Sequence, residues 1–254
     1  MKKTILSLVL LATFACGKEA TKETGIPDRT IPPVVVDPAD MNTIVPLLPS
    51  MYYLPQEKNI TCVGKYSTSG PVYDGSERSN IRDRKGKIIA TVCTRFYRVL
   101  NMEGSAILKD RGDGEIAVNY AGVVSSDRRF RILAHCSFGE GVKKNLCLLP
   151  HHTLATDNKA HAVGDIIYMP KADGLVLPDG TLHEGFFIVR DTGGAFQGIG
   201  AKRVDIFTGV EPDLNNTFSR AGFNHHTETE AFKVTGKSAD LIRNRLKEKF
   251  GQLY

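Results

Sequence analysis

Tryptophan and internal repeats are both absent from the 254-residue chain. Without tryptophan, any aromatic ring that stacks on a ligand has to come from Phe or Tyr. Beyond the N-terminus, no apolar run is long enough to span a membrane as a helix. Basic residues do not alternate with aromatic ones in any run, so the sequence does not favour a nucleic-acid-binding protein.

The first sixteen residues have the pattern of an export signal. Lys2 and Lys3 precede a short apolar run over residues 5–15, which ends at Ala15-Cys16-Gly17. This pattern is typical of a bacterial lipoprotein signal, and the run is too short for a transmembrane helix. We expect lipidation of Cys16 and a periplasmic protein anchored to the outer membrane, with plain secretion as the alternative. The only membrane contact expected is the lipid on Cys16.

The charge of the mature protein is mildly positive. The formal net charge of the whole chain is +5. Removing Lys2 and Lys3 with the signal leaves +3, because no other charged residue precedes Cys16. A charge of this sign suits an anionic polymer or a membrane surface.

Four cysteines remain after Cys16, which is an even set for an oxidising compartment: Cys62, Cys93, Cys136 and Cys147. We predict the pairs Cys62–Cys93 and Cys136–Cys147, because neighbours in sequence close the shortest loops. Four free thiols are the alternative. A zinc site is not favoured, since no CxxC pair is present. We expect no metal and no cofactor.

Residues 17–49 are predicted to be a tether. The segment is rich in Pro, Thr, Asp and Glu, and its prolines exclude a helix over residues 31–38. The valines in the same stretch leave open an alternative in which part of it packs along the domain as an extended arm. The remainder, residues 50–254, is predicted to be a single catalytic domain.

Short apolar or alternating runs between Asp-Gly and Gly-Asp turn signals predict a mainly β domain. The predicted strands cover residues 88–99, 105–109, 115–124, 130–135, 165–169, 185–189, 203–208 and 231–234. Only residues 238–250 have a helical pattern, with Leu241, Ile242, Leu246 and Phe250 on one face and Ser238 as the N-cap.

Three aspartates carry the candidate chemistry. Asp191 and Asp205 each lie beside an apolar strand, with a glycine-rich turn between them, and Asp157 precedes another strand. A tight turn could bring two adjacent strands, and with them Asp191 and Asp205, to one cleft. A carboxyl group beside apolar walls and other carboxylates has a raised pKa, which a general acid needs near neutral pH.

The ordered motifs over residues 148–226 resemble the three-aspartate (3D) domain of the membrane-bound lytic transglycosylase A family. The segments that carry the resemblance are LATDNKAHAVGDIIYMP, FIVRDTGGAFQGIGAKRVDIFTG and RAGFNH. The fourteen-residue step from Asp191 to Asp205 is a few residues longer than in that family, and the extra residues fall within 199–202.

The resemblance implies a double-psi β-barrel and non-hydrolytic cleavage of the MurNAc-β-1,4-GlcNAc bond of peptidoglycan. It implies that Asp205 acts as general acid and then base, which gives a 1,6-anhydromuramic end. Asp191 and Asp157 are then expected to offset charge on the sugar and to raise the pKa of Asp205 by repulsion. The expected substrate-binding residues are Gly193, Gly194, Arg203, Tyr168 and His225.

Two other functions stay open at this point. The first is a non-catalytic cell-wall-binding module on the same barrel. The second is a hydrolytic glycosidase that uses two of the three aspartates. The expected partners are peptidoglycan glycan strands, and we expect a monomer that binds no nucleic acid.

Overall fold

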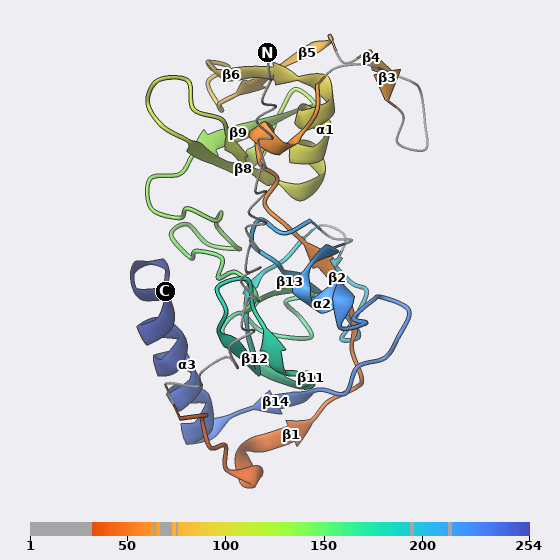
Figure 1. Cartoon of the computed structure of the whole chain (residues 1–254), viewed down its shortest axis with the longest axis vertical. Coiled ribbons are helices and arrows are strands. Elements are labelled where there is room, and N and C mark those ends of the chain that lie inside the picture. The colour runs from red at the N-terminus through yellow and green to blue at the C-terminus, as the bar shows by residue number, and fades with distance from the viewer. Residues whose placement is uncertain (1–31, 63–64, 67–72, 75, 194–195, 213–214) are drawn as a thin grey trace, which may run out of the picture.

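The computed structural model describes residues 32–62, 65–66, 73–74, 76–193, 196–212 and 215–254, in two lobes along its long axis (Figure 1). The larger lobe has the strands β1 (Met41–Thr43), β2 (Leu48–Tyr52), β10 (Thr153–Thr156), β11 (Ile166–Val176), β12 (Leu182–Asp191), β13 (Arg203–Phe207) and β14 (Phe232–Val234). Its α-helices are α2 (Thr217–Arg220) and α3 (Gly236–Phe250). Short 3-10 helices cover Pro38–Asp40, Glu57–Asn59 and Gly251–Leu253.

The smaller lobe is built from short hairpins and one helix. Its elements are β3 (Lys65–Tyr66), β4 (Tyr73–Asp74), β5 (Arg78–Arg82), β6 (Ile88–Cys93), α1 (Thr94–Glu103), β7 (Ser105–Leu108), β8 (Ile116–Val124) and β9 (Asp127–Ile132). Its strands pair as β3-β4, β5-β6 and β7-β8-β9. A core of its own includes Ile81, Phe96, Leu100 and Phe130, all fully buried.

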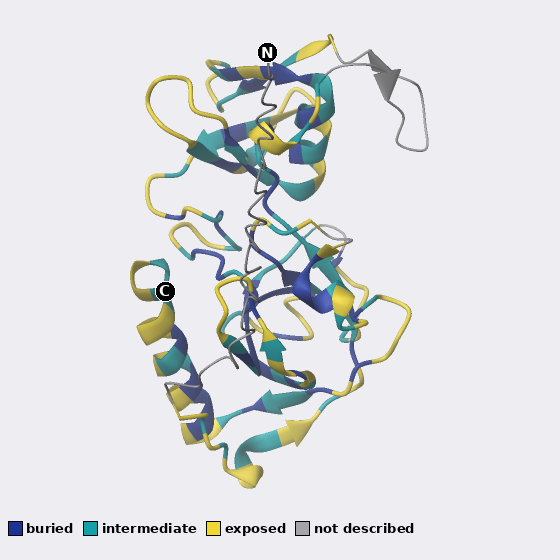
Figure 2. Ribbon diagram, viewed as in Figure 1, coloured by how far each residue is buried: buried dark blue, intermediate teal, exposed yellow. Residues whose placement is uncertain are grey.

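The larger lobe is organised around a seven-stranded sheet in the order β1-β14-β11-β12-β10-β13-β2. Most neighbours are antiparallel, but β10 pairs with β12 and β13 pairs with β2 in parallel. The fold is therefore mainly β with a C-terminal helix, as predicted. Buried residues concentrate in the strands and on the inner side of α3 (Figure 2).

Helix α3 packs one apolar side against this sheet. Ala239, Ile242 and Leu246 are buried with Ile166 and Ile188 of the sheet, and their spacing of three and four residues places them on one helix face.

One of the four residues predicted on the apolar face of α3 is exposed. Leu241 is 55% exposed. The helix also begins before Ser238, whose backbone N–H donates to the Asp40 carboxylate at 3.0 Å.

The predicted strand over residues 88–99 was wrong beyond Cys93. Strand β6 ends there, and α1 follows directly. Phe96 and Leu100 are both buried one helical turn apart, and Gly104 ends the helix with φ of 78°. Phe96, Tyr97 and Val99 are residues common in strands, so the sequence after Cys93 did not indicate the change from strand to helix.

Part of the predicted tether belongs to the sheet. β1 pairs with β14 and β2 pairs with β13, so residues 41–49 pack on the domain as the arm alternative describes. Residues 17–31 and the signal with Cys16 lie outside the described residues. No helix in the described part of the chain is long and apolar enough to cross a membrane.

Two disulfides are present, Cys62–Cys93 in the smaller lobe and Cys136–Cys147 at its junction with the larger lobe. Both are the predicted pairs. An apolar cluster at the same junction contains Leu54, Leu148 and Phe207, with Ile107 of the smaller lobe packed against it. The prediction of one unit over residues 50–254 stays a prediction.

Candidate active site

The site begins with a row of paired residues that crosses four strands. On the central strand β10, Ala155 pairs with Asp191 of β12 on one side and with Asp205 of β13 on the other. Asp205 in turn pairs with Ser50 of β2. Directly paired residues project from the same face of a sheet. Two carboxyl groups and a hydroxyl therefore share one face, and only the methyl group of Ala155 stands between the carboxyl groups.

This arrangement differs from the predicted one in its strand order. The sequence predicted that Asp191 and Asp205 lie on adjacent strands, whereas β10 lies between them. Neighbouring strands are about 4.8 Å apart, so the two Cα atoms are separated by about 10 Å. The two carboxyl groups therefore lie on the same face, with one strand between them.

A β-bulge determines which way Asp191 points. Leu154 pairs with Val189, and the next residue, Ala155, pairs with Asp191, so β12 has one extra residue at this point. The extra residue is Arg190. Because side chains alternate along a strand, one extra residue moves Asp191 to the opposite face. The bulge thus brings Asp191 into the row with Asp205.

Asp191 is held by two donors. The Tyr52 hydroxyl donates to Oδ2 at 3.0 Å, and the Thr192 backbone N–H donates to Oδ1 at 2.8 Å. Burial raises the pKa of Asp191 to about 6, and the charge of Asp205 acts in the same direction against these hydrogen bonds. Asp191 therefore carries a proton for part of the time near neutral pH.

Asp205 is held on one oxygen only. The Ser50 hydroxyl donates to Oδ1, and in the described part of the chain Oδ2 has no hydrogen-bond partner. Burial raises the pKa of Asp205, while the Ser50 hydrogen bond and the charges of Arg203 and His225 lower it. Burial is the main cause, where the sequence predicted repulsion from the other two aspartates.

Asp157 follows β10 and is 5% exposed. Its carboxylate accepts the backbone N–H groups of Lys159 at 3.0 Å, Gly198 at 2.9 Å and Gly200 at 3.4 Å. Led by the Lys159 N–H, these donors lower the pKa of Asp157. Asp157 therefore stays ionised and fixes the long turn between β12 and β13, where the extra residues were predicted.

The other predicted site residues lie in different places relative to the row. Arg203 is beside the row, and its Nη2 donates to Ser50 Oγ at 3.2 Å. His225 is exposed but close enough to lower the pKa of Asp205. Gly193 accepts the Phe196 N–H in the turn at 2.9 Å. Gly194 lies outside the described residues.

One family model matches this part of the chain, that of the 3D domain, over residues 152–230. The match covers about a third of the chain. The matched segment contains β10 to β13 and α2, and with them the three aspartates. Among curated proteins, none matches the chain.

Several solved structures are similar to the chain. MltA from E. coli is 13% identical with a TM-score of 0.42, covering 79% of this chain and 74% of that one. E. coli MltA with bound chitohexaose is 14% identical with a TM-score of 0.46, covering 75% and 71%. A membrane-bound lytic murein transglycosylase from Agrobacterium tumefaciens is 16% identical with a TM-score of 0.41, covering 83% and 77%. At these identities the likeness concerns the fold alone.

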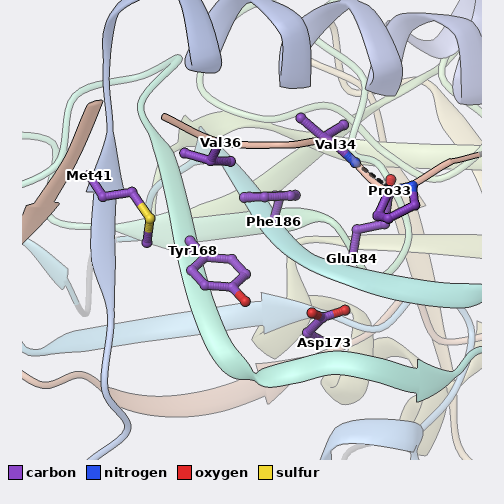
Figure 3. A pocket seen from close by; sticks show the side chains of 8 residues that line it. All are labelled: Pro33, Val34, Val36, Met41, Tyr168, Asp173, Glu184 and Phe186. Atoms are coloured by element: carbon purple, nitrogen blue, oxygen red, sulfur yellow. Dashed lines mark hydrogen bonds between the residues drawn. The ribbon is translucent and has the colours of Figure 1, made fainter. Parts of the chain in front are cut away.

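Tyr168, within the matched segment, is not at the aspartate row. It pairs with Phe186 on β12, and both line a pocket of about 200 Å³ beneath the N-terminal arm. Figure 3 shows the Tyr168 ring beside Phe186, with Asp173 and Glu184 at the same pocket. Gly185 makes room for this ring, since a Cβ there would lie 2.4 Å from it.

Two residues of the site were missed by the sequence analysis, Ser50 and Tyr52. Both lie on β2, directly after the predicted tether of residues 17–49. Their separation of two residues places them on one face of a strand, and this was the available signal. Among the described residues, no group of three or more His, Cys, Asp or Glu side chains is placed to hold a metal ion.

Proposed function

We propose that the protein is a peptidoglycan lytic transglycosylase that cleaves the MurNAc-β-1,4-GlcNAc bond without water. The observation that carries the proposal is the row in which Asp191 and Asp205 flank Ala155 with raised pKa values. The match to a 3D domain over the same strands supports it.

Asp205 is the proposed proton shuttle. Its Oδ2 is without a partner in the described residues and is therefore able to meet a substrate oxygen, whereas both Asp191 oxygens already accept hydrogen bonds. The protonated Asp205 donates to the leaving glycosidic oxygen. As a carboxylate it then accepts the proton of the muramic acid 6-hydroxyl, which attacks C1 and closes the 1,6-anhydro ring. Because this nucleophile is part of the substrate, its effective concentration is high and no water has to be positioned.

The remaining residues have supporting roles in this proposal. Asp191 stabilises positive charge that develops on the sugar ring, and Asp157 shapes the turn at the rim. Arg203, His225, Gly193 and Gly194 contact the glycan strand. Tyr168 is left out, because it lies in a pocket on another part of the sheet.

We also propose the setting of the enzyme. The sheet forms a double-psi β-barrel, the protein is a monomer, and lipid on Cys16 anchors it to the outer membrane from the periplasmic side. The parallel pairs β10–β12 and β13–β2 support a barrel of crossed connections over a simple antiparallel meander.

The test is product analysis. The domain without its signal is incubated with purified sacculi, and the released fragments are examined by mass spectrometry. Fragments with anhydro ends, one water lighter than reducing ends, are expected. Reducing ends would indicate a hydrolase, and binding without release would indicate a cell-wall-binding module.

A pair of variants assigns the proton shuttle. Asp205→Asn is expected to abolish release, since an amide cannot exchange the proton. Asp173→Asn is the matched control, because it makes the same change at the remote pocket and is expected to leave release intact. Full activity of Asp205→Asn would refute the assigned role.

A further inference from the structure

The bulge residue Arg190 is one of the most buried residues of the chain, with 2% of its surface exposed. Burying a guanidinium is costly unless it is hydrogen-bonded. The three aspartates do not use this side chain, so its burial next to Asp191 requires another explanation.

The side chain of Arg190 joins three backbone oxygens. Nη1 donates to the carbonyls of Cys147 at 2.7 Å and Leu253 at 3.1 Å, and Nη2 donates to the Tyr254 oxygen at 3.3 Å. The Tyr254 ring stacks on the guanidinium with its centroid 4.3 Å from Cζ. A planar guanidinium can make these bonds in several directions at once, which a lysine ammonium cannot do with the same geometry.

The backbone of Arg190 is held as closely as its side chain. The Val142 N–H donates to the Arg190 carbonyl at 3.0 Å. Gly141 approaches the same carbonyl so closely that a Cβ on it would lie 2.0 Å from the oxygen. Both contacts come from the loop between Cys136 and Cys147.

This loop is fixed to the smaller lobe. The Cys136–Cys147 disulfide closes it, and Glu140 forms an ion pair with Arg131 of β9. The Glu140 N–H also points to Asn119 Oδ1 at 3.4 Å. The backbone of Gly141 and Val142, which the disulfide and the Glu140–Arg131 ion pair hold in place, therefore packs directly against the bulge.

We propose that Arg190 is a positioning residue which, with the Cys136–Cys147 loop, holds the bulge that turns the Asp191 carboxyl into the row with Asp205. Without the bulge, regular alternation would place Asp191 on the opposite face of the sheet. The expected effect of losing Arg190 on kcat rests on the proposed lytic transglycosylase activity. The expected effect on the pKa of Asp191 does not depend on that activity.

The first test compares Arg190→Lys with Arg129→Lys in the otherwise complete mature protein. Arg129 is a matched control, because its side chain is also largely buried, at 11% exposed, but it lies on β9. Its Nε, like that of Arg190, is buried and has no hydrogen-bond partner among the described residues. The first readout is the Asp191 pKa, measured from its carboxyl carbon by NMR titration. A value of about 6 is expected in the parent. The pKa is expected to move away from this value in Arg190→Lys, because the carboxyl leaves the Tyr52 hydroxyl and the neighbouring Asp205, and to stay unchanged in the control.

The second readout is kinetic. Displacement of a positioned group by about 1 Å can cost about 100-fold in rate, so kcat on glycan strands is expected to fall about 100-fold in Arg190→Lys with little change in KM. A parent that releases no anhydro products would refute the proposed function, and the titration would still test the positioning role. A folded Arg190→Lys with an unchanged Asp191 pKa would overturn the inference.

Gly141→Ala tests the same inference with Arg190 intact. Its Cβ would force the Arg190 carbonyl to move, so the Asp191 pKa and kcat are expected to change as in Arg190→Lys. Gly86→Ala in the β5–β6 turn is the control for a purely local backbone change. A Cβ there meets nothing within 4 Å, so the strain of alanine at φ of 85° stays within that turn and both readouts are expected to keep their parental values. If Gly141→Ala leaves both readouts at parental values, the loop does not hold the bulge.

Discussion

Replacing Asp191 by Asn tests the buried carboxyl group without any substrate. Its pKa is raised from the ordinary 3.8 to about 6. Each pKa unit corresponds to about 1.4 kcal/mol, so the shift corresponds to about 3 kcal/mol. Because the pKa is higher in the folded state, the proton stabilises the fold fully below about pH 4, and this contribution is lost as the pH rises through 6. Asn imitates the protonated form at every pH.

The expected result is a pH-dependent gain in stability. At pH 8, Asp191→Asn is expected to raise the free energy of unfolding by up to about 3 kcal/mol, or Tm by about 6–12 °C for a chain of this size. At pH 4, parent and variant are expected to have nearly equal stability. Urea unfolding followed by circular dichroism, repeated at intervals between pH 4 and pH 8, measures the free energy of unfolding of parent and variant across this range.

Asp157→Asn provides a control of opposite sign. The pKa of Asp157 is lowered by backbone N–H donors. Its carboxylate therefore stabilises the fold above the ordinary carboxyl pKa, and that stability is lost as the pH falls through the lowered value. This variant is expected to be less stable than the parent at pH 7, with a deficit that shrinks in acid. If the stability of Asp191→Asn relative to the parent is the same at pH 4 and pH 8, the account of a buried, protonated Asp191 is refuted.

Three further predictions concern the row and its support. Ala155→Val places a larger side chain between the carboxyl groups, so it is expected to cut glycan release roughly 10- to 100-fold in activity assays while costing about 1–3 kcal/mol of stability. Ser50→Ala removes the hydrogen bond that lowers the pKa of Asp205, so the alkaline limb of the pH–rate profile is expected to move to higher pH; an unmoved limb would contradict the role of Asp205. Replacing Cys136 and Cys147 by Ala opens a loop with a sequence separation of 11, and thermal unfolding is expected to show a loss of roughly 3 kcal/mol.

The sequence predicted the parts of this fold that depend on local pattern. β12 lies at the apolar run that precedes Asp191, β13 lies where apolar residues flank Asp205, and α3 lies where apolar residues recur at helical spacing. The disulfide pairs followed from loop length. In each case the residues that determine the structure are neighbours in the chain, so one stretch of sequence contained the information.

Strand order and the composition of the site depend on distant residues. Ser50 meets Asp205 across 155 residues, and Tyr52 meets Asp191 across 139. Nothing near Pro49 marks β2 as the parallel partner of β13. The sequence therefore pointed to the two aspartates that the structure brings into one row, but it missed the two hydroxyl groups that hold them.

The bulge shows the same limit within a single strand. Residues 186–190 of β12 are all buried, so no alternation of apolar and polar residues indicates which face Asp191 occupies. The extra residue is an arginine, whereas a glycine would have suggested an irregular strand. What favours Arg190 at this point is its contact with Cys147 and with Tyr254, which are 43 and 64 residues away. The direction of Asp191 is therefore a property of the assembled fold, and substitutions far from the aspartates in sequence are expected to alter its pKa.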